Sequence, residues 1–367
     1  MPHFQWFRIN TNLVIMIITV AIFAGCAGPP GRHPAAEKPA DTGKTPQRRP
    51  PEIVIVDANQ TAAEGNLKKA ASMLEELTDS HPENIKALKL LAKIYSNLGK
   101  EDESFTLWER VYKLNPYDPD AAYETSKKLR YREDWSQLRS RMRDLEKKGA
   151  ADRRHYLMIG RADLRLGYKA EAEKYLLKAT GMKEADLLLG KLYYGRGRYS
   201  EAQKAFQKTL RKDKGNYSAH IYSGYIYYSR KRYAKALEHY RKALRTRNSS
   251  QANLCLAAVH QKLGNYSSAI EYFEDGLSKN DPRGTNERKK AYNTLCRLLI
   301  KRGKTDRAYS VIRRGIREFP DSGGLYFYWG TALFKDGFHA RAKDKFKKAA
   351  RDPSWKEIAL KKFHSIR

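Results

Sequence analysis

The chain has 367 residues, of which 41% are hydrophobic and 11% aromatic, enough to bury a substantial core. Its three cysteines lie far apart in the sequence, which excludes a small disulfide-stapled fold. A formal net charge of +31 favours anionic partners or surfaces.

Residues 1–25 are predicted to be a secretory signal peptide. Arg8 is the one charged residue before an apolar run, Leu13–Ala24, that only Thr19 interrupts. A helix of this run would reach about 18 Å, too short for the roughly 30 Å hydrocarbon core of a bilayer. A basic start, a short apolar run and small residues before a cleavage point are typical of export signals.

The end of this segment, Ala24-Gly25-Cys26, resembles the lipobox of bacterial lipoproteins. The resemblance implies that the Cys26 thiol receives a diacylglyceryl group and that cleavage makes Cys26 the first residue. Ala27, where that family places Asp for retention in the inner membrane, resembles outer-membrane sorting. The alternative is a free thiol after an ordinary signal peptide or signal anchor.

Residues 26–50 are rich in proline, glycine and charge and show no apolar periodicity. This composition predicts a disordered tether between the anchor and the folded part.

From residue 51 onward, small residues recur with a nearly constant step. The sequence numbers of successive members differ by 34, 34, 34, 30, 34, 33, 39 and 34 in turn. A period in this range indicates a repeat array. The members are Ala58, Ala92, Ser126, Gly160, Gly190, Gly224, Ala257, Cys296 and Gly330. We call them the register residues.

The clearest unit, 183–216, places Leu189-Gly190, Tyr193, Ala202 and Phe206 at the spacing L-G-x₂-Y…A-x₃-F. This pattern resembles the tetratricopeptide repeat. The resemblance implies two antiparallel helices per unit that approach closely at small residues and gain stability by stacking on their neighbours.

The resemblance predicts an all-α, right-handed α-solenoid of about nine helix-turn-helix repeats over residues 51–356. A capping helix would follow and end within residues 357–367. The units fall near 51–84, 85–118, 119–152, 153–182, 183–216, 217–250, 250–283, 289–322 and 323–356.

Two irregular steps and the C-terminus carry further expectations. Unit 153–182 should close early, and residues 283–288 should form a longer connection. Tyr199 is expected to fill the space around Gly190, and Ser354 to cap the final helix while Ile358 packs inward. The expected repeat-packing residues are Gly160, Gly190, Ala202, Gly224, Ala236, Ala308, Gly330 and Ala342.

In tetratricopeptide proteins the first helices line a groove that holds the ligand. Transferred unit by unit, that geometry gives an alternation of basic and aromatic candidates, which suits an extended and partly acidic peptide. Packing against the next unit is the alternative role for Tyr225 and Tyr228. The candidate groove residues are Tyr123, Lys127, Arg161, Lys191, Tyr194, Tyr225, Tyr228, Arg297 and Phe327.

No catalytic, cofactor or metal motif stands out. The nine histidines show neither H-E-x-x-H nor a Cys/His ligand spacing. Cys255 and Cys296 fall on predicted first helices, and the sequence does not decide whether they form a disulfide. The sequence therefore predicts a non-enzymatic chain without a cofactor.

The charge is unevenly distributed along the array. Residues 51–118 carry 8 Lys/Arg and 12 Asp/Glu, a net −4, whereas residues 183–250 carry 17 and 5, a net +12. Residues 289–367 carry 21 and 7, a net +14. A basic surface also attracts nucleic acid, which an exported lipoprotein rarely meets.

Together these features predict a lipid-anchored, protein-binding scaffold on the periplasmic side of the bacterial outer membrane. Tetratricopeptide lipoproteins that resemble this chain dock other envelope proteins during assembly of pilus, secretion or exopolysaccharide-export machines. The alternative is direct binding of an anionic glycan or peptidoglycan by the basic C-terminal repeats.

Overall fold

The structure is a computed structural model that describes residues 49–279 and 285–366. The predicted signal peptide, Cys26 and nearly all of the predicted tether lie outside the described residues. Residues from Pro50 onward form one compact unit.

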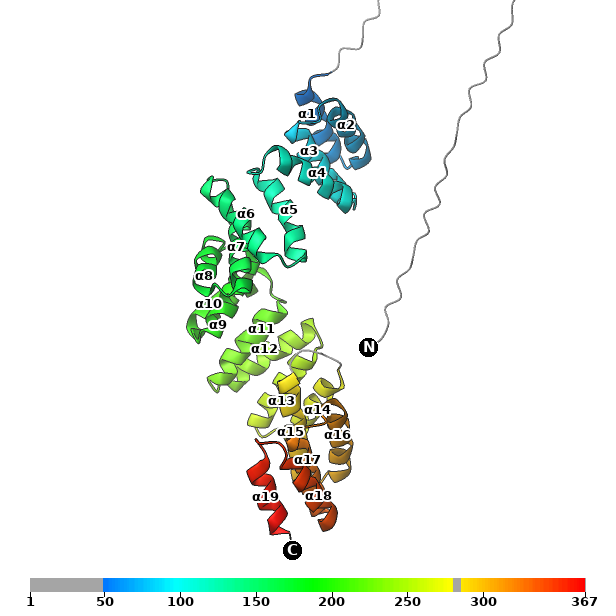
Figure 1. Cartoon of the computed structure of the whole chain (residues 1–367), viewed down its shortest axis with the longest axis vertical. Coiled ribbons are helices and arrows are strands. Elements are labelled where there is room, and N and C mark those ends of the chain that lie inside the picture. The colour runs from blue at the N-terminus through cyan, green and yellow to red at the C-terminus, as the bar shows by residue number, and fades with distance from the viewer. Residues whose placement is uncertain (1–48, 280–284, 367) are drawn as a thin grey trace, which may run out of the picture. The chain divides into compact units, whose positions relative to one another are not determined.

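The described residues form nineteen α-helices and no strand (Figure 1). In chain order the helices are α1 (Pro51–Ala63), α2 (Leu67–Ser80), α3 (Ile85–Asn97), α4 (Glu101–Leu114), α5 (Pro119–Tyr131), α6 (Trp135–Lys147), α7 (Arg153–Leu166), α8 (Lys169–Lys178), α9 (Lys183–Gly195), α10 (Tyr199–Lys212), α11 (Tyr217–Ser229), α12 (Tyr233–Thr246), α13 (Ser250–Lys262), α14 (Tyr266–Ser278), α15 (Thr285–Lys301), α16 (Thr305–Glu318), α17 (Gly323–Lys335), α18 (His339–Ala349) and α19 (Lys356–Ser365).

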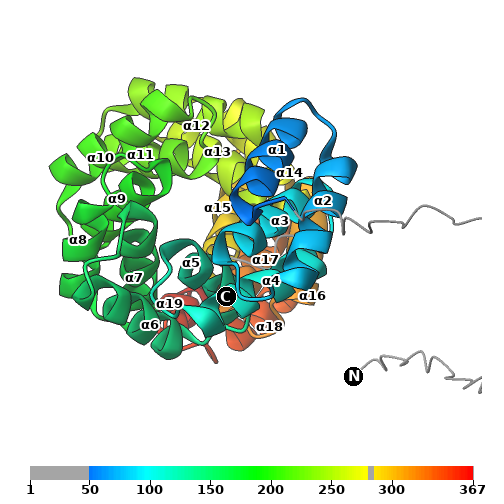
Figure 2. The ribbon, with the colours of Figure 1, turned by 90° about the horizontal axis from the view of Figure 1, so that it is seen from above.

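Consecutive helices pair, from α1 with α2 to α17 with α18, and each pair packs on the next. First helices of neighbouring pairs also contact each other: α7 contacts α9, and α9 contacts α11. In Figure 2, α9 and α11 lie on the inner side of the stack, and α10 and α12 lie on its outer side. The predicted α-solenoid is therefore present, with first helices inside and second helices outside.

The glycines among the register residues lie where the two helices of a pair approach closely. A Cβ atom on Gly190 would stand 2.5 Å from Phe206 Cε1, and one on Gly224 would stand 2.3 Å from Tyr240 Cε1. Gly160 and Gly330 face Leu176 and Phe346 in the same way. In these four units the facing side chain follows its glycine at one constant spacing, so the sequence period and the helix contact share one register.

The turn inside each pair uses the same register. The residue seven places after each register residue has positive φ, a left-handed conformation that glycine adopts most easily. Gly197 is one example, at φ 74°. In two units a residue with a side chain takes this place, Glu133 and Lys231, both at φ 58°.

The two irregular steps change helix length. Where the step is 30, the second helix α8 has only 10 residues, whereas α10 and α12 have 14 each. Where the step is 39, the first helix α15 has 17 residues, whereas most first helices have 13. The longer connection predicted for 283–288 is wrong in part, because Thr285 to Arg288 form the first turn of α15. Part of the insertion is therefore an extra helical turn.

The last helix, α19, covers the end of the array. Ala359 and Ile366 are buried there, and Trp355 and Phe363 pack against the same cluster. Two expectations about this segment are wrong. Trp355 occupies the N-cap and no side chain caps the helix, and Ile358 is 47% exposed because it lies on the solvent side of α19.

Candidate functional site

The candidate groove residues all lie on first helices. Tyr123 and Lys127 belong to α5, Arg161 to α7, Lys191 and Tyr194 to α9, Tyr225 and Tyr228 to α11, Arg297 to α15, and Phe327 to α17. Eight of them are exposed or half-buried. Phe327 is not available to a ligand, because it is buried between Phe346 of α18 and Trp355, which precedes α19.

The structure brings the central tyrosines together into one cluster. The Tyr194 ring lies 5.2 Å from that of Tyr222 and 6.2 Å from that of Tyr225, between centroids. Tyr222 also stacks on Phe206, which faces Gly190. Tyr199 joins this cluster from α10 and is 39% exposed, so the expectation that it fills the space around Gly190 is wrong.

Beyond this cluster, the inner face changes character at α13. Counted from their register residues, Cys255, Ala258 and Gln261 of α13 stand where α11 carries Tyr222, Tyr225 and Tyr228. Each of these replacements removes an aromatic ring. A pocket of about 660 Å³ opens at this point, with walls from α11, α13 and α15.

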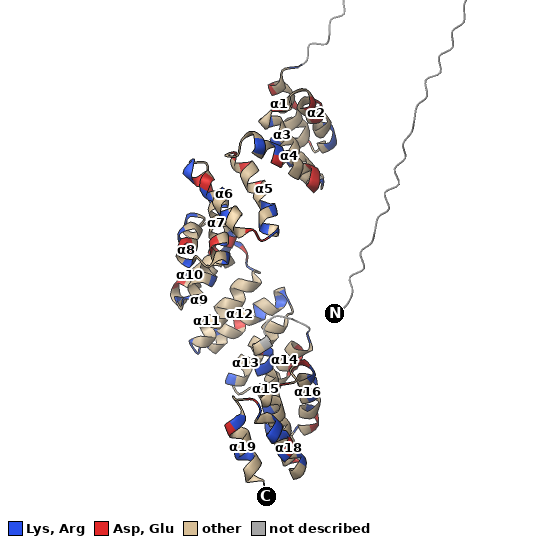
Figure 3. Ribbon diagram, viewed as in Figure 1, with Lys and Arg blue, Asp and Glu red and all other residues tan. Residues whose placement is uncertain are grey.

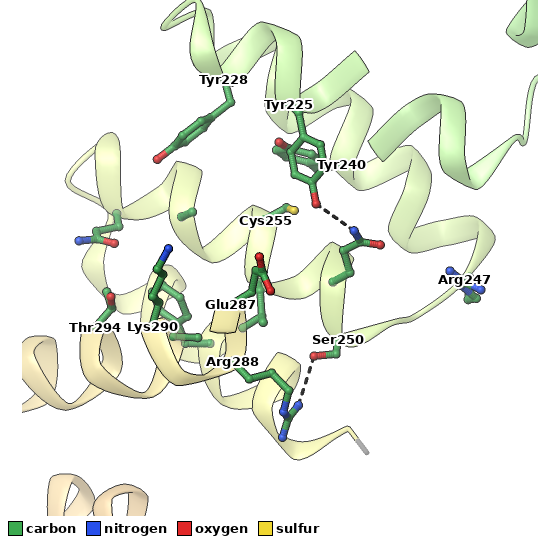
Figure 4. A pocket seen from close by; sticks show the side chains of 16 residues that line it. Tyr225, Tyr228, Tyr240, Arg247, Ser250, Cys255, Glu287, Arg288, Lys290 and Thr294 are labelled. Atoms are coloured by element: carbon green, nitrogen blue, oxygen red, sulfur yellow. Dashed lines mark hydrogen bonds between the residues drawn. The ribbon is translucent and has the colours of Figure 1, made fainter. Parts of the chain in front are cut away.

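Figure 4 shows how the pocket is built. Tyr225 and Tyr228 enter from α11 on one side, Glu287 and Lys290 stand on α15 on the other, and Cys255 lies between them. The pocket thus offers aromatic faces on one wall and charged side chains on the opposite wall.

Polar contacts fix the aromatic wall. Gln251 Nε2 donates a hydrogen bond to Tyr225 Oη at 2.9 Å, and Tyr217 Oη donates to Gln251 Oε1 at 3.1 Å. Burial raises the pKa of Tyr225 well above its ordinary value, and it raises the pKa of the Cys255 thiol to about 12. Both groups are therefore neutral near pH 7, and Cys255 is a poor nucleophile.

The extra turn of α15 is held in place by Arg288, which is 7% exposed. Its Nε and Nη2 atoms donate to the two carboxylate oxygens of Glu318 in α16, at 2.6 and 2.8 Å. Its Nη1 donates at 2.9 Å to the carbonyl oxygen of Lys279, just after α14. One buried side chain, which itself lines the pocket, thus joins α14, α15 and α16.

Cations lie along the same inner face. Lys191 is half-buried beside the Tyr222 ring, and burial lowers its pKa below the ordinary value. Arg297 is exposed and forms no ion pair with any described residue. By contrast, Arg161 pairs with Glu184, and Lys127 with Glu124. Figure 3 shows Lys and Arg segments on α15 and α18.

The residues assigned to repeat packing lie inside the pairs. Among them Ala202, Ala236, Ala308 and Ala342 are fully buried. The glycines at 160, 190, 224 and 330 form the close helix approaches given above.

The described residues contain no group of three or more His, Cys, Asp or Glu residues placed to hold a metal. Cys255 and Cys296 are both free thiols in this structure. Among residues 49–279 and 285–366, no helix is both long and apolar enough to cross a bilayer.

The pocket is the feature that sequence reasoning missed. Gln251, Cys255, Ala258 and Lys290 line it, yet none is a candidate in the sequence, which singled out prominent basic and aromatic residues. The available signal was the loss of three tyrosines at matching repeat positions of α13, next to the step of 39.

Comparisons with known proteins agree with this architecture. Family models described as tetratricopeptide repeat match residues 154–186 and 187–253. These residues are therefore tetratricopeptide repeats, a class that acts as protein-interaction scaffold and is typically not catalytic. No curated protein matches the chain.

Solved structures resemble parts of the chain in fold. The MamA protein is 21% identical with a TM-score of 0.41, over 46% of this chain and 90% of that one. YrrB, described as a TPR protein with an unusual peptide-binding site, is 19% identical with a TM-score of 0.43, over 51% and 94%. The APC/C hetero-tetramer Cut9-Hcn1 is 14% identical with a TM-score of 0.47, over 82% and 59%.

Proposed function

We propose that this chain is a lipid-anchored scaffold of the bacterial envelope that holds an extended segment of a partner protein on its inner face. The observation that carries the proposal is the pocket between α11, α13 and α15. It is concave, partly apolar and lined by a few oriented polar groups, which are the features of ligand sites.

The pocket's lining suggests which segment would fit. Tyr225, Tyr228 and Leu254 offer apolar surface for one bulky side chain of the partner. Lys290 stands at the opposite wall on α15. Arg297 lies further along the same helix, and Lys191 lies on α9, the first helix before α11. A peptide with an aromatic or branched side chain next to a carboxylate could pack that side chain on Tyr225 and Tyr228 and pair the carboxylate with Lys290.

The place of action rests on the sequence. Leu13–Cys26 has the pattern of a lipoprotein signal, and Ala27 fits outer-membrane sorting. The proline-rich residues that follow would hold the repeats away from the bilayer. We therefore place the chain at the outer membrane facing the periplasm, where it would dock components of a pilus, secretion or exopolysaccharide-export machine.

A photo-reactive amino acid at position 228 tests the pocket in cells that naturally make the chain. We expect one dominant crosslinked envelope protein from position 228 and none from the matched position 131, since Tyr131 is 89% exposed and lies outside the pocket. Equal crosslinking from both positions would show that the inner pocket does not select the partner.

The anchor is tested separately with Cys26→Ser. The variant should leave the membrane fraction while the unchanged chain stays in it, because the acyl chains supply the membrane affinity. A variant that still sediments with membranes in high salt would contradict the lipid anchor.

A further inference from the structure

Two crevices on the second-helix side of the array are lined at matching repeat positions. One, of about 320 Å³, lies between α4, α5 and α6, and the other, of about 600 Å³, lies between α16, α17 and α18. Phe105 and Tyr309 follow their register residues at the same spacing (105 − 92 and 309 − 296). Arg141 and Lys345 also share one spacing from theirs (141 − 126 and 345 − 330). We call these hollows the outer crevices.

The α4–α6 crevice gathers cations that the surrounding protein does not neutralise. Lys113, Lys128, Arg132 and Arg141 line it, and none of them forms an ion pair with a described carboxylate. Glu109 is the one acidic residue among the lining residues. Neighbouring cations on the same helices behave differently, because Lys127 pairs with Glu124 and Arg139 pairs with Asp163.

The key cation of this crevice is already oriented. The Arg141 guanidinium lies over the Tyr112 ring, 4.4 Å from its centroid, and Nη1 donates at 3.0 Å to Oγ1 of the buried Thr125. Lys128 lies over Phe105 at 4.4 Å. Cation–π contacts hold these side chains without cancelling their charge, so they stay attractive to an anion.

The α16–α18 crevice is lined at matching repeat positions but holds its cations through different partners. Lys345 lies over the Trp329 ring at 4.6 Å and pairs with Asp344, while Arg313 is exposed and forms no ion pair with a described residue. Arg341 lies beside the Phe338 ring, which is 49% exposed. Each crevice therefore combines aromatic surface with positive charge.

We propose that the outer crevices bind a linear acidic polysaccharide. The apolar C–H face of a pyranose ring would pack on aromatic surface, and its carboxylate would meet the guanidinium of Arg141 or Arg341. The sequence suggested, as an alternative function, that the basic C-terminal repeats bind an anionic glycan. We place glycan binding in both outer crevices instead of in the C-terminal repeats alone.

The test is calorimetric titration of the full-length chain in detergent with a decameric oligogalacturonate at low ionic strength. We expect the double variant Lys128→Met/Arg141→Met to weaken binding at the α4–α6 crevice at least tenfold, so that the stoichiometry falls from two oligomers per chain to the one held by the α16–α18 crevice. The control Lys204→Met/Lys208→Met removes the same charge from exposed positions of α10 and should bind nearly as the unchanged chain does. An equal loss in the control would overturn the proposal in favour of diffuse charge.

Two further ligands decide the chemistry. Oligoglutamate of equal length and charge should bind at least tenfold more weakly than oligogalacturonate, because it has no ring to pack on the aromatic surface. Equal binding of the two would replace the polysaccharide with an acidic peptide. A neutral maltodextrin should not bind measurably, and its binding would show that the carboxylates contribute nothing.

Folding and the inner pocket are controlled separately. Lys128→Met alone changes an exposed side chain and should still lower affinity severalfold, which keeps the test informative if the double variant unfolds. Ala258→Tyr, which fills the inner pocket, should leave oligogalacturonate binding unchanged. The proposal for the outer crevices can therefore fail or hold independently of the proposed function.

Discussion

The helix pairs α9–α12 and α13–α16 share one packing register but present different inner surfaces. In α9–α12 the space beside the groove is occupied by Tyr194, Tyr222 and Tyr225, whose rings contact one another. In α13–α16 smaller side chains replace such rings, and the pocket opens. The repeat contact therefore fixes the backbone, while residues next to the register residue, such as Tyr225 in α11 and Ala258 in α13, decide whether the inner face is filled or hollow.

The two regions also differ in how they are held together. The regular pairs depend on close approaches at glycine, as at Gly190 and Gly224. Around the longer α15, a buried charged side chain, Arg288, joins three helices. Different substitutions should therefore break the two regions.

Arg288→Met should have the largest effect. It removes the donors of Arg288 to Glu318, which keeps the hydrogen bond from Tyr292, and to the carbonyl oxygen of Lys279 at the end of α14. Because Glu318 is one-third exposed, we expect a loss near the lower end of the range for a buried pair, about 3 kcal/mol. The measurement is urea unfolding. The control Arg307→Met removes a more exposed pair with Glu274 and should cost no more than about 1 kcal/mol. Equal losses would show that the extra turn does not depend on Arg288.

The same pair gives a pH signature. The Arg288 guanidinium lowers the pKa of Glu318 below its ordinary value of 4.5, so the ionised form is favoured in the folded chain. The ionised Glu318 therefore stabilises the folded chain at a pH above 4.5, and this stabilisation is lost as the pH falls through the lowered pKa of Glu318. Arg288→Met should reduce this acid-dependent loss, and the hydrogen bond from Tyr292 and the charge of Arg314 should keep the rest of it.

Gly190→Leu should break the regular region next. A Cβ atom alone would stand 2.5 Å from Phe206, so a leucine forces the α9–α10 pair apart at a cost of about 1–3 kcal/mol or more. Gly195→Ala, on the same helix, meets no atom within 4 Å and should be neutral or slightly stabilising. Thermal unfolding compares the two, and an unchanged melting temperature for Gly190→Leu would refute the register.

Acid should weaken the regular region through a histidine pair. His220 Nε2 donates to the Lys214 carbonyl, which leaves its Nδ1 to accept from His239 Nδ1, 3.1 Å away. Burial and His220 lower the pKa of His239 to about 4. The unfolded chain therefore binds the proton more tightly, and stability falls as the pH drops from about 6.5 to about 4.

His239→Gln should remove about 1–2 kcal/mol of this acid-dependent loss, a figure reduced for the partial exposure of the ring. Urea unfolding at pH 7 and pH 4.5 measures the difference. His339→Gln, a matched change at an exposed histidine, should leave the pH dependence as it is. A parallel shift of both variants would assign the acid sensitivity elsewhere.

Ala258→Tyr should make α13 resemble α11 at the smallest cost in stability. The added ring enters an existing hollow, so we expect a change below about 1 kcal/mol in unfolding and at least a tenfold drop in crosslinking from position 228. Undiminished crosslinking in a folded variant would mean that the partner does not enter the pocket.

Much of the array was predictable because its physics is local and repeated. Gly190 with Phe206, and Gly224 with Tyr240, follow from a small residue and a ring at a fixed short spacing, which two helices and a short turn bring together. The all-α class and the α-solenoid follow from the same period. The basic and aromatic character of the inner face was also visible, since Tyr194 and Tyr228 stand at the same repeat position of successive first helices.

Other features depend on contacts between units. Phe327 matches the groove position, yet Trp355 and Phe346 cover it because α19 closes the array there. The pocket needs the replaced tyrosines of α13 together with the extra turn of α15, and the insertion looked like a loop in the sequence. The sequence determined the repeat and its packing through short-range spacing. The tertiary structure alone decided which inner and outer surfaces stay hollow, because that depends on side chains of three neighbouring helices at once.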